Sequence, residues 1–113
     1  MTILQTNLKS LSLLHQGKVR DIYNINDEKM LIVTTDRLSA FDVIMNEPIP
    51  NKGKVLTQMA NFWFKRLDGI APNHLLDDDP SNFVSDEEAI KIKGRSVVVK
   101  KLKPIPIEAI VRG

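Results

Sequence analysis

A glycine followed by alternating cations is the first feature of this sequence that could perform chemistry. Gly17, Lys18, Val19 and Arg20 lie between two apolar-rich segments. Glycine lets backbone N–H groups approach a ligand, and Lys18 and Arg20 occupy alternate positions. Such a turn can cover the phosphates of a nucleotide. A hairpin glycine with solvated cations beside it is the commoner arrangement, so the residues alone favour a simple turn.

A second dense group of polar side chains follows a predicted strand. Asp36, Arg37, Ser39 and Asp42 bring two carboxylates, a guanidinium and a hydroxyl close together in the sequence. The end of a strand is a usual place for ligand contacts. The same residue types also form Asx turns and helix caps with an exposed ion pair, which would contribute only about 1 kcal/mol. Spacing alone leaves both interpretations open.

Glu108 and Arg112 interrupt an apolar run near the end of the sequence. They are four positions apart, so on a strand they would share one face. Buried charges need partners. The two side chains could pair with each other, which the residues alone favour slightly, or they could hold a metal ion and an anionic substrate.

The aromatic residues and histidines give weaker signals. Phe62, Trp63 and Phe64 could stack on nucleobases, but aromatics on an amphipathic helix are far more often core, and we predict that they are core. His15 and His74 stand apart in a sequence that contains no cysteine. A zinc site is therefore not expected, and the two histidines remain unassigned.

The candidate turn must be positioned by strands in the first part of the chain. Apolar residues from Leu11 to Leu14 and from Val19 to Ile25 predict a strand, a glycine turn and a second strand. The β-branched run from Met30 to Thr35 predicts a third strand and hence an antiparallel meander. The segment from Asp36 to Met45 lacks a clean period, and Pro48 follows it, so we predict a structured loop there.

The second half of the chain contains the strongest helix signal. Apolar residues recur at helical spacing from Gly53 to Leu67, and Asp68-Gly69 is a stop signal. Ala71 to Gly94 has prolines and acidic clusters, which predicts a connection with one short strand near Asn82 to Ser85. Two further strands are predicted at Arg95 to Leu102 and Ile105 to Val111.

Composition limits the class of protein. The chain has 113 residues, of which 42% are hydrophobic and 27% charged, as in a globular domain with one core. The absence of cysteine, of a signal peptide and of a long apolar run predicts a cytoplasmic protein without a membrane partner. The net charge is +2, but Lys93 to Lys103 holds five basic residues. Such a stretch could meet the phosphates of a small ligand or of nucleic acid.

Three motifs taken in order resemble the succinocarboxamide synthase family of purine synthesis. They run from Gly17 to Tyr23, from Thr35 to Val43 and from Pro106 to Arg112. Ile49 to Gly53 and Asn61 to Phe64 are also similar to the family, so the resemblance covers nearly the whole chain. It implies an α+β fold, with an antiparallel sheet and one main packed helix. The expected architecture is a kinase-like or ATP-grasp-like amino-terminal lobe, that is, a truncated SAICAR synthase-like fold.

The resemblance also implies an activity. The family is an ATP-dependent ligase that joins L-aspartate to carboxyaminoimidazole ribonucleotide, with ATP and Mg²⁺ as cofactors and ADP and phosphate among the products. Activating a carboxylate by phosphoryl transfer requires mainly charge neutralisation, which cations supply. The glycine turn would then cover the ATP phosphates, and a second segment would follow the adenine edge. The implied ATP-binding residues are Gly17, Lys18, Val19, Arg20, Lys100, Lys101 and Leu102.

The same matching assigns residues to the substrate side. Asp36, Ser39 and Asp42 would line it, and Arg112 would contact the ribonucleotide phosphate. Glu108 would help to position magnesium or the imidazole carboxylate. No residue in this chain is identified as certainly catalytic, because the family's glycine-serine motif and its later acidic residues would follow Gly113.

Residues 1–113 are therefore expected to form the ATP-binding amino-terminal lobe of a longer enzyme. Without the carboxy-terminal lobe, the chain should lack ligase turnover and should expose apolar surface that favours self-association. One alternative is a small basic β-domain that binds nucleic acid, although the exposed aromatic pattern of such modules is absent. Another is the ATP lobe of a different kinase-like enzyme, for which a protein kinase's Lys–Glu pair and fuller glycine loop are missing. We expect no nucleic-acid partner.

Overall fold

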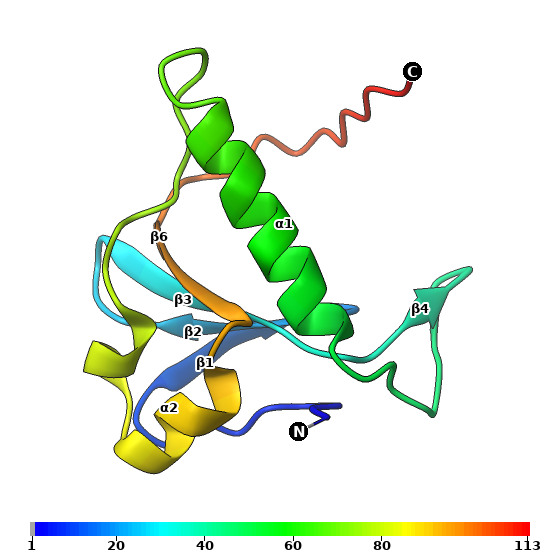
Figure 1. The fold of residues 1–113 in the computed structure, drawn as a ribbon, viewed down its shortest axis with the longest axis vertical. Helices are drawn as coiled ribbons and strands as arrows, with labels where there is room; N and C mark the ends of the chain where they lie inside the picture. The colour runs from blue at the N-terminus through cyan, green and yellow to red at the C-terminus, as the bar shows by residue number, and fades with distance from the viewer. Residues whose placement is uncertain (1) are drawn as a thin grey trace.

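A computed structural model describes residues 2–113. It contains a four-stranded antiparallel sheet in the order β1, β2, β3, β6 and a separate two-stranded hairpin (Figure 1). The α+β class and the meander of the first three strands are confirmed. The strands of the main sheet are β1 (Ser12–Gln16), β2 (Arg20–Asn24), β3 (Lys29–Thr34) and β6 (Ser96–Lys100).

The main hydrophobic core lies on one face of this sheet. Alternation along the strands sends every second side chain of β2, β3 and β6 to that face, where they meet helix α2 (Asp86–Ile92) and the segment before β1. The opposite face is turned toward the long helix α1 (Lys52–Arg66). The buried core residues are Leu8, Tyr23, Leu31, Val33, Ile92 and Val98.

Helix α1 confirms the predicted helix, but its packing corrects the prediction for two aromatics. Phe62 is 50% exposed and Trp63 is 52% exposed, so they are not core residues. Their rings stack on each other, with centroids 5.2 Å apart. The side of α1 that faces the sheet carries Thr57 and, seven residues or two turns later, Phe64, whereas Phe62 and Trp63 fall on other sides of the helix. Phe64 is half-buried.

The connection from α1 to β6 contains helices instead of the predicted short strand. Pro80–Phe83 forms a 3₁₀ helix, and α2 follows it. The sequence signal that was overlooked is a capping box: Ser85 accepts a hydrogen bond from the Glu88 backbone, and the Glu88 carboxylate accepts one from the Ser85 backbone. A strand at Asn82 to Ser85 was therefore a wrong prediction.

Glu88 also ties the amino-terminal segment to α2. Its carboxylate accepts a hydrogen bond from the Lys9 backbone N–H at 2.5 Å and another from the Ser10 hydroxyl. The hydrogen bond from Ser10 is the largest cause that lowers the pKa of Glu88, to about 2; partial burial opposes it, and contacts with Ser85 and Lys9 add to it. The carboxylate thus stays charged in acid.

Two further predictions are corrected by local structure. The predicted loop after β3 contains a short hairpin, β4 (Ser39–Ala40) and β5 (Val43–Ile44). Its tip residues Phe41 and Asp42 have φ of 51° and 62°, the left-handed geometry of a type I′ turn. The predicted strand at Ile105 to Val111 is absent, and its apolar residues are exposed. Pro104 and Pro106 remove N–H donors that a strand would need.

Across the described residues, none of the helices has the length and apolar character that spanning a bilayer requires.

Candidate functional site

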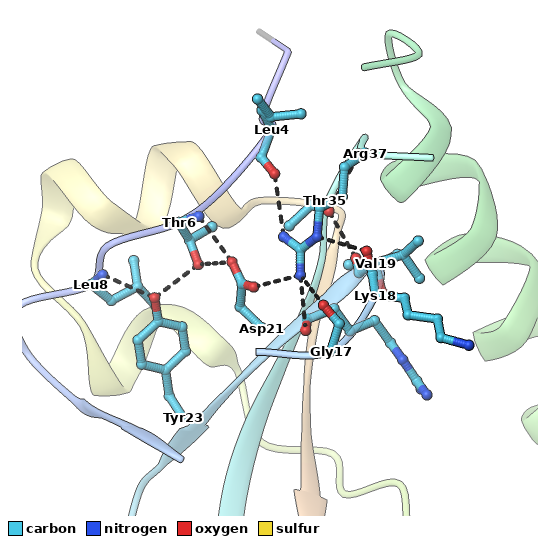
Figure 2. Close-up of polar contacts among 12 residues, drawn as sticks. Leu4, Thr6, Leu8, Gly17, Lys18, Val19, Asp21, Tyr23, Thr35 and Arg37 are labelled. Atoms are coloured by element: carbon cyan, nitrogen blue, oxygen red, sulfur yellow. Dashed lines mark hydrogen bonds and ion pairs between the residues drawn. The ribbon is translucent and has the colours of Figure 1, made fainter. Parts of the chain in front are cut away.

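The candidate glycine turn forms the tip of the β1–β2 hairpin, as predicted. The Gly17 N–H donates to the Arg20 carbonyl oxygen at 2.7 Å, which closes the turn around Lys18 and Val19. The Lys18 side chain points away from the Arg37 guanidinium and from Asp21 (Figure 2). Residues of the turn and the adjoining strands, among them His15 and Ile22, line a hollow of about 310 Å³.

A buried arginine on the inner side holds the turn in place. Arg37 is 3% exposed. Its Nη2 donates to the Gly17 carbonyl at 2.7 Å and to the Arg20 carbonyl at 3.2 Å, and its Nε donates to the Lys18 carbonyl at 2.8 Å (Figure 2). The guanidinium therefore donates hydrogen bonds to carbonyl groups on both sides of the tip. Sequence reasoning placed Arg37 in a ligand-contacting motif but did not foresee this role.

An acidic network neutralises Arg37 in the interior. Asp21 is 1% exposed, and its Oδ1 lies 2.8 Å from Arg37 Nη2. The other oxygen of Asp21 accepts from the Thr6 backbone N–H at 2.9 Å and from the Thr6 hydroxyl at 2.6 Å. The Thr6 hydroxyl in turn contacts the Tyr23 hydroxyl at 2.8 Å (Figure 2). A buried charge pair with satisfied lone pairs avoids the cost of an uncompensated ion.

Thr35 fixes the remaining carbonyl of the turn. Its backbone N–H and its hydroxyl both donate to the Val19 carbonyl, at 3.0 Å and 2.8 Å. Thr35 is fully buried and directly follows β3. The motif that begins at Thr35 thus supports the glycine turn from beneath.

The hairpin β4–β5 brings Asp42 to Lys18. The Lys18 ammonium forms an ion pair with the Asp42 carboxylate, and the two side chains are 62% and 81% exposed. The pKa of Lys18 is raised, first by the hydrogen bond to Asp42, then by the charge of Asp42, and to a smaller extent by Glu108. The pKa of Asp42 is lowered by the same contact. Exposed pairs of this kind rearrange at little cost when a stronger anion arrives.

Asp36 lies elsewhere, in the protein interior. It is 0% exposed and forms a bidentate pair with Arg95, at 2.8 Å and 3.0 Å. Its oxygens also accept from the Ile3 backbone N–H at 2.9 Å and from the Gly53 backbone N–H at 2.8 Å. Burial raises the pKa of Asp36, but these hydrogen bonds and the charge of Arg95 outweigh it and lower the pKa overall. Because Asp36 presents no surface, the structure gives no support to its predicted place on the substrate side.

An apolar cavity of about 360 Å³ lies between α1 and the sheet, next to the glycine turn. This size falls within the range of small-molecule pockets. Two polar atoms on its wall, Thr57 Oγ1 and Asn61 Oδ1, are buried and have no hydrogen-bond partner among the described residues. Val19, Ile32, Val97 and Val99 contribute apolar wall from the sheet.

His74 lies at the wall of this α1–sheet cavity. Its ring packs edge-on against Phe64, with the centroids 5.7 Å apart. The pKa of His74 is lowered, mainly by burial and secondarily by the charge of Arg20. Both effects favour the neutral imidazole, which forms part of a mostly apolar wall.

The segment predicted to follow adenine lies at the other end of the sheet. Lys100 pairs with Lys29 at one end of the β3–β6 ladder, while Ser96 pairs with Val33 beside the glycine turn. Four residue steps separate these ends, about 13 Å at the usual rise per residue. The Lys100 backbone N–H donates to the His74 carbonyl, and the Lys101 N–H donates to the Glu28 carbonyl, both at 2.8 Å.

The other predicted substrate and metal residues are spread out. Ser39 lies in β4, half-buried, while Glu108, Arg112 and Leu102 are exposed after β6. No ion pair joins Glu108 to Arg112 in residues 2–113, so the predicted structural pair is wrong. In the same range, no three acidic or imidazole side chains gather as metal ligands.

An antiparallel sheet with a cationic turn at one end, and an apolar cavity beneath an adjoining helix, defines an α+β lobe with a face suited to an anionic ligand. The family model described as SAICAR synthetase matches residues 13–113. The chain belongs to the SAICAR synthetase family, which confirms the resemblance inferred from the three motifs.

Curated relatives agree with this assignment. The phosphoribosylaminoimidazole-succinocarboxamide synthase of Halorhodospira halophila is 58% identical over 111 residues, which cover 98% of this chain and 38% of the relative. The synthase of Cupriavidus necator is 60% identical, and the match covers 98% of this chain and 37% of the relative. The chain thus spans less than two fifths of the length of these relatives.

Solved structures share the fold. A SAICAR synthase matches with a TM-score of 0.84 and 41% identity, over 93% of this chain and 39% of that one. The Saccharomyces cerevisiae SAICAR synthase complexed with SAICAR matches with a TM-score of 0.81 and 40% identity. This match covers 88% of this chain and 37% of the yeast chain. A type-2 SAICAR synthetase in complex with ADP matches with a TM-score of 0.64 and 22% identity. This match covers 81% of this chain and 34% of the type-2 synthetase chain. The predicted SAICAR synthase-like fold is confirmed.

Proposed function

We propose that residues 1–113 are the nucleotide-covering amino-terminal lobe of an ATP-dependent carbon–nitrogen ligase of purine synthesis. The longer enzyme would join L-aspartate to carboxyaminoimidazole ribonucleotide and release ADP and phosphate. The observation that carries this proposal is the cationic glycine turn, whose carbonyl groups accept hydrogen bonds from Arg37, in a chain of the SAICAR synthetase family. The lack of cysteine suits a reducing cytoplasmic compartment.

The proposed nucleotide lies along the strands. Its phosphates would meet the turn at Gly17 to Arg20, and its base would lie toward Lys100, Lys101 and Leu102 at the other end of the sheet. The separation of these two groups of residues suits an elongated ligand. Thr57 and Asn61 would supply polar contacts from the α1 side of the cavity between them. A relative complexed with ADP supports a nucleotide as the ligand class.

The substrate side is proposed around the β4–β5 hairpin. Ser39 and Asp42 would face it, and Arg112 would meet the ribonucleotide phosphate after the exposed carboxy-terminal segment folds over the site. Mg²⁺ usually takes one or two carboxylates together with substrate phosphates and water. Glu108 could supply one ligand, but residues 2–113 form no complete set of metal ligands, so we assign no step to the ion.

Lys18 should contribute to ATP affinity through its charge. We expect Lys18→Ala to weaken ATP binding about tenfold, because a charge-assisted hydrogen bond to phosphate is lost. Lys18→Arg should retain most of the affinity. Lys91→Ala is the matched control, since Lys91 is an exposed lysine in the last turn of α2, away from the turn (Figure 1). Isothermal titration calorimetry measures the ATP affinity of all three variants. Equal ATP affinities for Lys18→Ala and Lys91→Ala would contradict the proposed phosphate site.

The rest of the enzyme should be needed for turnover. The exposed apolar residues of α1 and of the segment after β6 are the surface that we propose the carboxy-terminal lobe covers. One wall of a two-walled cleft cannot exclude water. We therefore expect the isolated chain to release no ADP in an aspartate-dependent manner and to self-associate in light scattering.

A hybrid enzyme tests whether this chain supports turnover when the rest of the enzyme is present. In it, this chain replaces the matching 111 residues of the Halorhodospira halophila relative. We expect the hybrid to release ADP only when aspartate and carboxyaminoimidazole ribonucleotide are both present. Aspartate-dependent turnover by the isolated chain, or a folded hybrid without turnover, would refute the proposed division of the site.

A further inference from the structure

The glycine turn presents its backbone N–H groups outward because its carbonyl groups are captured from within. In a trans peptide, the C=O and the N–H point in opposite directions. The Gly17 and Lys18 carbonyls accept from Arg37, so the N–H groups of Lys18 and Val19 must point away from the guanidinium. The Val19 carbonyl accepts from Thr35, which directs the Arg20 N–H away from the interior in the same manner.

Two of these amides are available to a ligand. Within residues 2–113, neither the Lys18 N–H nor the Val19 N–H donates to a protein acceptor. Both residues line the 310 Å³ hollow at the hairpin tip, together with Arg20. Successive backbone N–H groups that point into a concave surface form an anion-binding nest, and the side chains of Lys18 and Arg20 add positive charge there.

We propose that Arg37 is a positioning residue for phosphate binding: it holds the turn so that the Lys18 and Val19 amides, as well as the cations, meet the phosphates of the nucleotide. This inference rests on the proposed nucleotide function. Arg37 itself does not touch the ligand, because it is buried and its donors are used by Asp21 and by backbone carbonyls. Asp21 and Thr35 complete the support from the inner side.

The planar fork of arginine is what this role requires. Nε and Nη2 donate in one plane to carbonyls on both sides of the tip, while Nη2 also meets Asp21. A lysine ammonium would keep the charge beside Asp21, but it is a compact group that cannot span these acceptors. Arg37→Lys should therefore fold more readily than Arg37→Ala, while it loosens the turn.

The test compares Arg37→Lys in the hybrid enzyme with a second buried arginine. We expect Arg37→Lys to raise the KM for ATP about tenfold, as for the loss of one or two hydrogen bonds to a charged group, with the KM for aspartate unchanged. Arg95→Lys is the control, because Arg95 is fully buried and, within residues 2–113, its side chain donates to Thr34 and Asp36 rather than to the carbonyl groups of the turn. It should lower the urea midpoint of unfolding as Arg37→Lys does, and leave the KM for ATP unchanged.

Two inhibitors separate phosphate recognition from base recognition. Inorganic triphosphate should inhibit the Arg37→Lys hybrid about tenfold more weakly than the parent hybrid, whereas adenosine should inhibit both equally. An unchanged KM for ATP, equal changes for ATP and aspartate, or equal weakening of triphosphate and adenosine would overturn the positioning role while leaving the nucleotide function intact. A parent hybrid that folds but neither turns over nor binds ATP would overturn the proposed function and this inference together.

Discussion

Replacing Gly53 with alanine is expected to destabilise the fold by about 3 kcal/mol or more. A Cβ at this position would lie 2.2 Å from the Thr34 carbonyl oxygen, 2.7 Å from Arg95 Nη1 and 2.8 Å from the Thr35 carbonyl oxygen. Two of these atoms belong to the backbone beside the glycine turn, so they cannot move without disturbing β3. The first turn of α1 would have to lift from the sheet.

Gly69→Ala is the matched control for this substitution. Gly69 follows α1 with φ of +85°, and an added Cβ would have nothing within 4 Å. Its cost should be about 1 kcal/mol, from the left-handed backbone alone. Urea denaturation followed by circular dichroism measures both variants. Similar losses at the two positions would show that the close approach of α1 to β3 is not what makes Gly53 necessary.

The sheet and the main helix could be predicted because their signals are local. Val19 to Ile25 and Met30 to Thr35 carry β-branched and apolar residues at strand spacing, and the apolar period from Gly53 to Leu67 is helical. The glycine turn followed directly from its place between two predicted strands. The missed helix α2 also had a local signal, the Ser85 and Glu88 capping box.

The support of the turn could not be predicted, because it depends on contacts far apart in the sequence. Arg37 reaches back to Gly17 and Lys18. The buried pair of Arg95 and Asp36, which lies outside the turn, joins distant parts of the sequence in the same way. An isolated sequence shows charged residues but not which of them are buried. Asp21 did offer a partial signal, since it shares a strand face with the buried Tyr23 and so stands at a core position.

The apolar run from Ile105 to Val111 is a case in which a clear local strand signal gave a wrong prediction. Ile105, Ile107 and Ile110 predicted a buried strand, yet they are 60% or more exposed. A β-rich composition indicates surface that can be buried, but it does not say against what. The chain spans less than two fifths of the length of the curated relatives. In the enzyme that we propose, the carboxy-terminal lobe supplies the surface that covers this run.

Breaking the second buried ion pair should be as damaging as the change at Gly53. Asp36→Asn removes the carboxylate charge that faces the buried Arg95 guanidinium, and breaking a buried ion pair in this way typically costs about 3–5 kcal/mol. The asparagine also turns one acceptor into a donor that faces the Arg95, Ile3 or Gly53 N–H groups. Asp42→Asn is the control, because it removes an exposed carboxylate from an exposed pair and should leave the unfolding midpoint nearly unchanged.

The pH dependence of the stability lost in Asp36→Asn shows whether Asp36 stabilises the fold by its charge or by packing. The pKa of Asp36 is lowered in the folded state, so its stabilising contribution is fully present above its unfolded value near 3.8 and disappears as pH falls through the folded pKa. The difference in free energy of unfolding between the parent chain and Asp36→Asn should therefore be constant at neutral pH and shrink in acid below about pH 4. Denaturation series from pH 7 to about pH 2 would show this narrowing. If the difference remained constant over the whole series, Asp36 would stabilise the fold by shape and hydrogen bonding rather than by its charge.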